Sequence, residues 1–150
     1  MSKSEKKLNF GQSLVEVVIA LTVLAIVLTG LVRTVTVSQK NMRYSRNKNF
    51  GLLLVRKKIE ALRQERDSQP WGVFWGNYFE GASPRQPTSE TNLNEAGVSV
   101  TGGIFTRLTT FVNLSALEKN KMKADVEVSW PDGQETFSTS STIILTKWID

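Results

Sequence analysis

The pattern of apolar residues changes along this chain, and its first part is an almost unbroken apolar run. Residues 14–32 contain a single charged residue, Glu16. An α-helix of this length spans about 28 Å, which is enough to cross the hydrocarbon core of a membrane. The run is longer than the apolar region of a secretory signal peptide, and no small-x-small cleavage site follows it. We therefore expect a single membrane span here.

A helical pattern continues beyond the apolar run. No proline occurs before Pro70, and apolar residues of the later part recur at spacings of three and four. These residues are Leu52, Val55, Ile59 and Leu62. Such a periodicity is typical of a helix with one buried face. We predict one helix from about Gln12 to about Arg66, with an apolar first half, interrupted only by Gly30, and an amphipathic second half.

Residues 68–96 predict a connecting region, because prolines and glycines recur through them. The region contains a cluster of aromatic residues, namely Trp71, Phe74, Trp75, Tyr78 and Phe79. Two interpretations remain open. The rings pack between the helix and a sheet, or they form an exposed adhesive or subunit-contact patch.

From residue 97 the pattern has a period of two, which indicates half-buried strands. Residues 97–101 predict a short strand, with a hairpin turn at Gly102 and Gly103. Residues 104–114 predict a second strand, with an apolar face made of Ile104, Leu108, Val112 and Leu114. The next strand alternates most regularly, and its inward residues are Met122, Ala124, Val126, Val128 and Trp130.

Residues 131–133, Pro-Asp-Gly, predict a turn into the last strand, residues 134–148. The inward face of that strand is ambiguous by one residue, which is compatible with a bulge. The predicted fold class is therefore α+β. One long N-terminal helix packs on a C-terminal antiparallel sheet of about four strands.

The composition argues against enzymatic chemistry. The chain has no cysteine and no histidine, so the commonest general base and the commonest metal ligands are missing. The carboxylates of Asp125, Glu127 and Asp132 lack the order of a calcium-binding loop. We expect no catalytic site, no metal and no cofactor.

The net charge of +5 is concentrated after the apolar run. Residues 33–58 contain no acidic residue but eight basic ones, which are Arg33, Lys40, Arg43, Arg46, Lys48, Arg56, Lys57 and Lys58. One interpretation is a solvated or lipid-facing flank of the span. The other is a nucleic-acid contact, for which all of these residues except Arg33 are candidates.

The residues at the start of the apolar run form a specific pattern. A short basic leader ends at Gly11, and Glu16 follows five residues later. This pattern resembles the class III signal of type IV pilins and pseudopilins. The resemblance implies that a prepilin peptidase cuts between Gly11 and Gln12, and that Gln12, where most members have Phe, becomes an N-methylated first residue. It also implies that Glu16 pairs with the α-amino group of Gln12 in a neighbouring subunit.

The strand–turn–strand ending resembles minor pilins of the PilV class and related secretion pseudopilins. The resemblance divides the chain into a leader (1–11), a transmembrane or filament-core helix (12–33), the amphipathic half of the helix (34–66), an aromatic-rich connecting loop (67–96) and an antiparallel β domain (97–150).

The function that this resemblance implies is structural. The chain would be a minor pilin or pseudopilin of a type IV pilus, or of a related secretion or competence filament. It would cross the cytoplasmic membrane once and then join an extracellular or periplasmic filament. The implied partners are other pilin subunits, a prepilin peptidase, a membrane assembly platform and lipid. The alternative is a pilus subunit that binds DNA or a surface ligand through the basic stretch or the aromatic segment.

Overall fold

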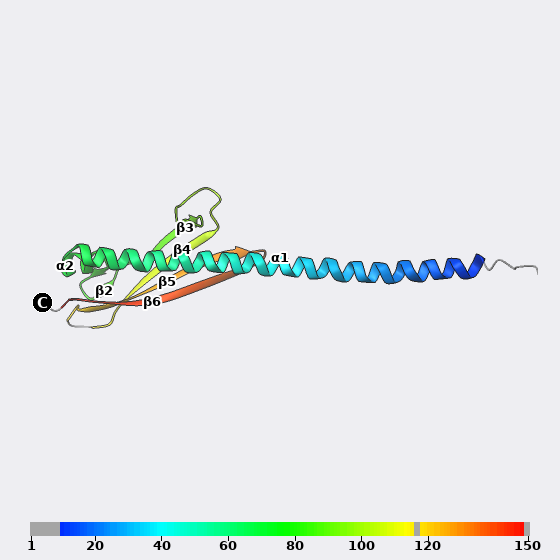
Figure 1. Ribbon diagram of the computed structural model, residues 1–150. Coiled ribbons are helices and arrows are strands. Elements are labelled where there is room, and N and C mark those ends of the chain that lie inside the picture. Colours follow the sequence, from blue (N-terminus) through cyan, green and yellow to red (C-terminus); the bar gives the residue numbers. More distant parts are fainter. Residues whose placement is uncertain (1–9, 116–117, 149–150) are drawn as a thin grey trace, which may run out of the picture. The chain divides into compact units, whose positions relative to one another are not determined.

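The computed structural model describes residues 10–115 and 118–148. Its elements are α1 (Phe10–Ser68), α2 (Trp71–Tyr78), β1 (Phe79–Glu80), β2 (Ser83–Pro84), β3 (Thr88–Leu93), β4 (Phe105–Asn113), β5 (Lys121–Asp132) and β6 (Glu135–Thr146). The chain divides into two compact units at residue 43 (Figure 1). The first unit holds the apolar part of α1. The second holds the rest of α1 and all other elements.

The long helix confirms the prediction from periodicity. It ends at Ser68, two residues before Pro70, because proline disfavours helical backbone in the residue that precedes it. In the first unit its apolar side chains are exposed on every side, from Leu14 to Val37. In the second unit Leu54, Val55 and Leu62 are buried, so only this part of the helix has an inward face.

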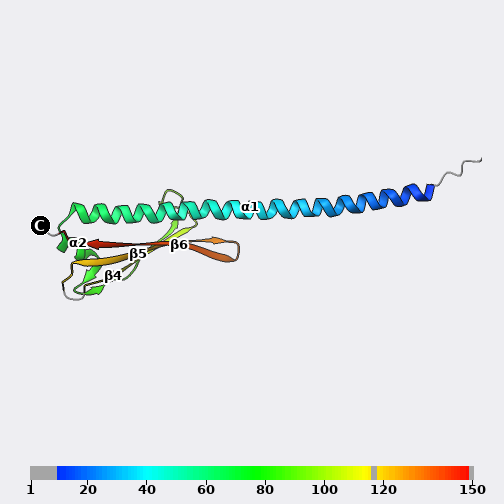
Figure 2. The same ribbon diagram turned by 60° about the horizontal axis from the view of Figure 1, so that its bottom comes forward.

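The sheet of the second unit has the strand order β3-β4-β5-β6, with every neighbouring pair antiparallel (Figure 2). This confirms the α+β fold, to which β1 and β2 add a small two-stranded sheet. A two-residue turn at Gly133 and Gln134 joins β5 to β6, and Gly133 has a φ of +70°, which glycine adopts without strain. Pairing of the two strands continues from the turn to Lys121 and Thr146 without a bulge.

The inner face of β5 is the one that its alternation predicts. Met122, Ala124, Val126, Val128 and Trp130 are all at most 1% exposed. They form the buried face of the sheet, against which α1 packs.

For β4, the strand that precedes β5, the predicted inward face is wrong by one residue. In β4 the inward residues are Phe105, Arg107, Thr109 and Phe111. Leu108 and Val112 lie on the outer face, 38% and 41% exposed. The reason is a long-range one. Phe105 and Phe111 fill the core beside β5, and the guanidinium of Arg107 is neutralised inside by an acid on β3.

The predicted strand at residues 97–101 is also wrong, since the first strand of the sheet is Thr88–Leu93. Residues 94–100 form a loop held by the Asn94 side chain, which accepts hydrogen bonds from the N–H groups of Ala96 and Val98. The turn at Gly102 exists, with a φ of +85°. Because β3 is a mostly exposed edge strand, its sequence lacks the apolar alternation that marks the others.

The expected connecting loop at residues 67–96 contains regular structure. Its aromatic residues line one face of α2 at helical spacing, a pattern that Gly72 and Gly76 obscure. Phe74, Trp75 and Phe79 are buried, and Trp71 and Tyr78 pack against the core. The interpretation as core packing is therefore confirmed, and the exposed patch is excluded for these rings.

The helix α1 lies very close to the sheet at Gly51. A Cβ atom placed there would lie 2.9 Å from the Trp130 ring and 3.0 Å from the Thr139 methyl group. Glycine at this position lets the helix backbone rest directly on the indole ring.

We predict that Gly51→Val lowers the free energy of unfolding by about 1–3 kcal/mol, because the added atoms overpack the contact with Trp130. Gly72→Ala is the matched control, since nothing lies within 4 Å of a Cβ there, and it should stabilise by up to about 1 kcal/mol. Urea titration of the detergent-solubilised chain, followed by tryptophan fluorescence, measures both. Equal effects of the two substitutions would contradict the close packing at Gly51.

Candidate functional site

In the described residues of the first unit, from Phe10 to Arg43, the chain forms α1, which is long and apolar enough to cross a membrane. Its threonine side chains are hydrogen-bonded within the helix. The hydroxyl groups of Thr22, Thr29, Thr34 and Thr36 each donate to the carbonyl oxygen four residues earlier, at 2.8–3.0 Å. These threonines therefore add little polarity to the apolar surface, because a donor paired with a backbone carbonyl needs no water.

Glu16 is the one ionisable side chain between Leu14 and Val32, and it is exposed on α1. Gly11 and Gln12 precede it in the same helix. Gln12 lies four residues before Glu16, so the two positions share a helix face about 6 Å apart along the axis. A carboxylate in an apolar segment is costly without a cationic partner. Pairing of Glu16 with another subunit remains a prediction.

Some residues of the basic stretch make contacts within the second unit. Arg46 pairs with Glu95 at 2.6 Å, and Lys57 donates to the carbonyl oxygen of Ala96 at 3.1 Å. Lys58 pairs with Glu90 at 2.8 Å. Lys48 lies 6.0 Å from the centre of the Tyr44 ring. Of the other candidates, Lys40, Arg43 and Arg56 are exposed. Three residues of the stretch thus hold β3 and the loop after it to α1, and a nucleic-acid contact through the others remains a prediction.

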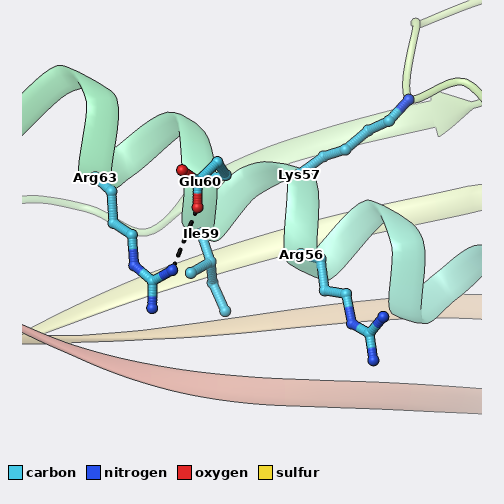
Figure 3. Close-up of a pocket in the computed structure, with 5 residues that line it drawn as sticks. All are labelled: Arg56, Lys57, Ile59, Glu60 and Arg63. Atoms are coloured by element: carbon cyan, nitrogen blue, oxygen red, sulfur yellow. Dashed lines mark hydrogen bonds and ion pairs between the residues drawn. The ribbon is translucent and has the colours of Figure 1, made fainter.

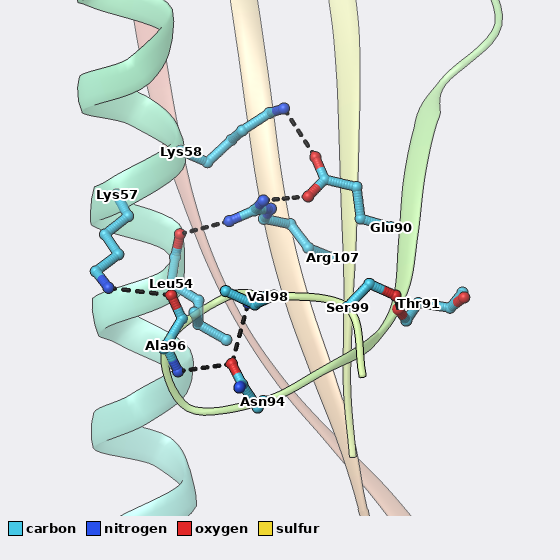
Figure 4. A network of polar contacts seen from close by, with 10 residues as sticks. All are labelled: Leu54, Lys57, Lys58, Glu90, Thr91, Asn94, Ala96, Val98, Ser99 and Arg107. Atoms are coloured by element: carbon cyan, nitrogen blue, oxygen red, sulfur yellow. Dashed lines mark hydrogen bonds and ion pairs between the residues drawn. The ribbon is translucent and has the colours of Figure 1, made fainter. Parts of the chain in front are cut away.

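Glu90 on β3 joins the helix to the sheet through two cations (Figure 4). One oxygen accepts from Lys58 of α1, and the other accepts from Arg107 of β4. Arg107 is only 9% exposed, and its guanidinium also donates to the carbonyl oxygen of Leu54 at 3.4 Å. Burial raises the pKa of Glu90, but the hydrogen bonds and charges of Lys58 and Arg107 outweigh burial and hold it below 4.5.

A second polar centre holds α2 against the end of α1. Glu65 accepts hydrogen bonds from the Tyr78 hydroxyl at 2.5 Å, from Asn77 at 3.1 Å and from Gln69 at 3.3 Å. Burial and the Glu65 carboxylate together raise the pKa of Tyr78 well above its usual range. Sequence analysis identified neither centre, because the members of each come from different elements and belong to no recognised motif.

The first unit carries the recognisable signal. Residues 6–32 match the family model of the prokaryotic N-terminal methylation motif. This segment is a class III prepilin signal. Comparisons with curated proteins and with solved structures gave no match to this chain.

The prepilin signal supports a type IV pilin-like family for the chain. Its matched residues include Gly11, Gln12 and Glu16, although the leader residues 1–9 lie outside the described part of the structure. A prepilin signal on an apolar helix indicates membrane anchoring, consistent with a single span. It also implies processing by a prepilin peptidase and assembly with other pilin subunits.

We predict that Glu90→Gln lowers the free energy of unfolding at pH 7 by about 1.5–3 kcal/mol, because Arg107 loses its charged acceptor. The pKa of Glu90 is lowered in the folded state, so its contribution is complete above 4.5 and is lost as the pH falls below that value. Glu90→Gln should therefore flatten the acid limb of stability against pH.

The matched control is Asp125→Asn. Asp125 pairs with Lys123 at 2.8 Å on the outer face of the sheet, where an ion pair contributes less than about 1 kcal/mol. Urea titrations between pH 3 and 7 measure the free energy of unfolding of both variants. If the two substitutions lowered the free energy of unfolding by similar amounts, the Glu90 ion pairs would stabilise the fold no more than an exposed ion pair does.

Proposed function

We propose that this chain is a minor pilin or pseudopilin, a structural subunit of a type IV pilus or a related secretion or competence filament. The observation that carries the proposal is a prepilin signal lying on a helix that is apolar enough to span a membrane. The subunit is held in the cytoplasmic membrane by residues 12–33 and leaves it for an extracellular or periplasmic filament. The assignment to the PilV class belongs to this proposal.

Assembly requires an exchange of environments for α1. In the membrane its apolar surface faces lipid, and in a filament it faces the helices of other subunits. Because lipid tails are as apolar as the helix, the exchange depends on close packing and on polar contacts between helices, more than on the hydrophobic effect. Glu16 supplies such a polar contact, since a carboxylate in apolar surroundings needs a cation.

The cation for Glu16 is the α-amino group of Gln12 in the neighbouring subunit, which cleavage after Gly11 creates and N-methylation leaves protonated. A pair of this kind fixes the axial position of one helix against the next, because any other position leaves both charges unpaired. The second unit, residues 44–150, has its own buried core. It is the part that the filament displays.

We predict that the membrane-extracted chain, coexpressed with a prepilin peptidase, has an intact mass that lacks residues 1–11. Gly11→Val should block the cut, because a branched side chain prevents close approach of the protease to the backbone. Gly30→Ala is the matched control in the same helix and should leave cleavage unchanged, since nothing lies within 4 Å of its Cβ position. A retained leader in the unaltered chain would overturn the proposal.

We predict that Glu16→Ala is cleaved normally but enters filaments at least about tenfold less often, as loss of an ion pair of about 1.4 kcal/mol implies. Quantitative immunoblots of sheared filaments and of membranes measure the ratio. Glu60→Ala, which removes a largely exposed carboxylate from the second unit, should have no effect. Normal incorporation of Glu16→Ala would refute the pairing.

A further inference from the structure

The two outer edges of the sheet differ, and the β3 edge is covered along its second half, from Thr91 to Leu93. Residues after β3 fold back along it, so that Leu93 pairs with Ser99. The Ser99 hydroxyl donates to the carbonyl oxygen of Thr91 at 3.0 Å, and Val100 N–H donates to that of Asn92 at 2.9 Å. The pairing of β3 with β4 is also irregular. Coverage and irregularity are devices by which sheets avoid pairing with further strands.

The β6 edge has none of these devices. β6 is 12 residues long and pairs with β5 without a register shift. From Thr136 to Thr146 it contains no proline and no charged residue. Lysine and proline are the residues that usually keep an exposed edge strand from pairing with another strand. In the described part of the chain, no strand pairs with its outer side.

The backbone groups that β6 offers can be assigned. Lys147 N–H donates to the carbonyl oxygen of Asn120 at 2.8 Å, in line with the β5 ladder. Hydrogen-bonding direction alternates along an antiparallel strand. The odd-numbered residues of β6 therefore bond to β5. The even-numbered ones direct N–H and C=O outward, and the central four are Ser138, Ser140, Thr142 and Ile144.

The helix α1 flanks this edge within the second unit. Tyr44 packs edge-on against Phe137, with ring centroids 5.0 Å apart, near the start of β6. The guanidinium of Arg66 lies 4.9 Å from the centre of the Trp148 ring, just beyond its end. Residues 44–66 of α1 and β6 therefore run side by side in the same direction. Ser141 points inward and is nevertheless exposed, so α1 does not close over the middle of β6.

The side of α1 next to β6 combines apolar and cationic groups. Leu52 and Ile59 are half-buried, whereas Arg56 and Arg63 are exposed. Both arginines extend from the helix to the side on which β6 runs (Figure 3). A shallow hollow of about 530 Å³ on the surface of α1 is lined by Arg56, Lys57, Ile59, Glu60 and Arg63. The one carboxylate there, Glu60, pairs with Arg63 at 3.3 Å and is itself 72% exposed.

We propose that the β6 edge binds an extended acidic segment of a partner protein, which adds a strand to the sheet. Its backbone pairs with the outward groups of β6. On the side that faces α1, its residues alternate between apolar side chains, which pack beneath Leu52 and Ile59, and carboxylates, which pair with Arg56 and Arg63. Main-chain bonds supply affinity in this mode of recognition, and the alternate side chains supply selectivity.

A second copy of β6 fits the edge less well. Its only carboxylate, Glu135, stands at one end of the strand, so the arginines would face uncharged side chains. The proposal uses no residue of the prepilin signal. It therefore stands or fails independently of filament assembly.

The test uses a fluorescein-labelled peptide, Val-Thr-Glu-Thr-Val-Thr-Glu-Thr-Val, and the full chain in detergent micelles. Its valines and glutamates share one face of a strand. In fluorescence anisotropy, the analogue with lysine in place of glutamate should bind at least about tenfold more weakly, since two exposed ion pairs become repulsions. Arg56→Glu combined with Arg63→Glu should reverse this preference.

Amide hydrogen exchange locates the peptide. Binding should slow exchange at Ser138, Ser140, Thr142 and Ile144, while the odd-numbered amides, already bonded to β5, change little. Ser140→Pro removes one outward N–H and should weaken binding about tenfold, whereas Ser140→Ala should not. Unchanged exchange at the odd-numbered amides verifies that the proline variant is folded.

Three results would overturn the proposal. They are equal binding of the acidic and basic peptides, no slowing at the even-numbered amides when the peptide is saturating, and a dimer of the peptide-free chain that protects those same amides.

Discussion

The structure of the second unit depends on the burial of one stripe of α1 against the inner face of the sheet. Its centre is the contact between Gly51 and Trp130, where the helix backbone meets the indole ring. Trp130 in turn lies 6.0 Å from Phe105 and 6.4 Å from both Tyr44 and Phe137, measured between ring centroids. This layer decides which face of each strand is inward. Once it is set, a shift of any strand by one residue would expose its whole buried row.

The ionic centre at Glu90 follows from the same packing. Arg107 occupies an inward position of β4, where a guanidinium is stable only with a charged acceptor. The β3 edge supplies it, and Lys58 shares the carboxylate from the helix side. Helix, edge strand and neighbouring strand are thereby joined at one point. Because each cation bonds a different oxygen of Glu90, β3 has one favourable position relative to α1.

One continuous helix serves two environments. From Leu14 to Val32 it is apolar on all sides apart from Glu16, the pattern of a helix that lipid or other helices surround. From Tyr44 onward it has an inward stripe, a β3 side that holds a loop through Arg46 and Lys57, and a β6 side with the exposed arginines Arg56 and Arg63. The prepilin signal lies wholly in the first part. The residues that we propose to serve membrane attachment and assembly thus lie in one part of α1, and the residues that pack on the sheet lie in the other.

The sequence by itself determined the apolar span, the Gly11–Glu16 spacing of the prepilin signal, the length of α1 and the inner face of β5, because each is a local pattern read within one element. It misplaced the face of β4, whose inward row contains an arginine and a threonine, so hydrophobicity alone favours the opposite face. It also overlooked α2, where two glycines interrupt the apolar pattern, and β3, which is largely exposed. Tertiary structure decided these features, together with the partners of Glu90 and the open edge of β6. The partners of Arg107, for example, lie 17 and 53 positions away in the sequence, and no local pattern contains that information.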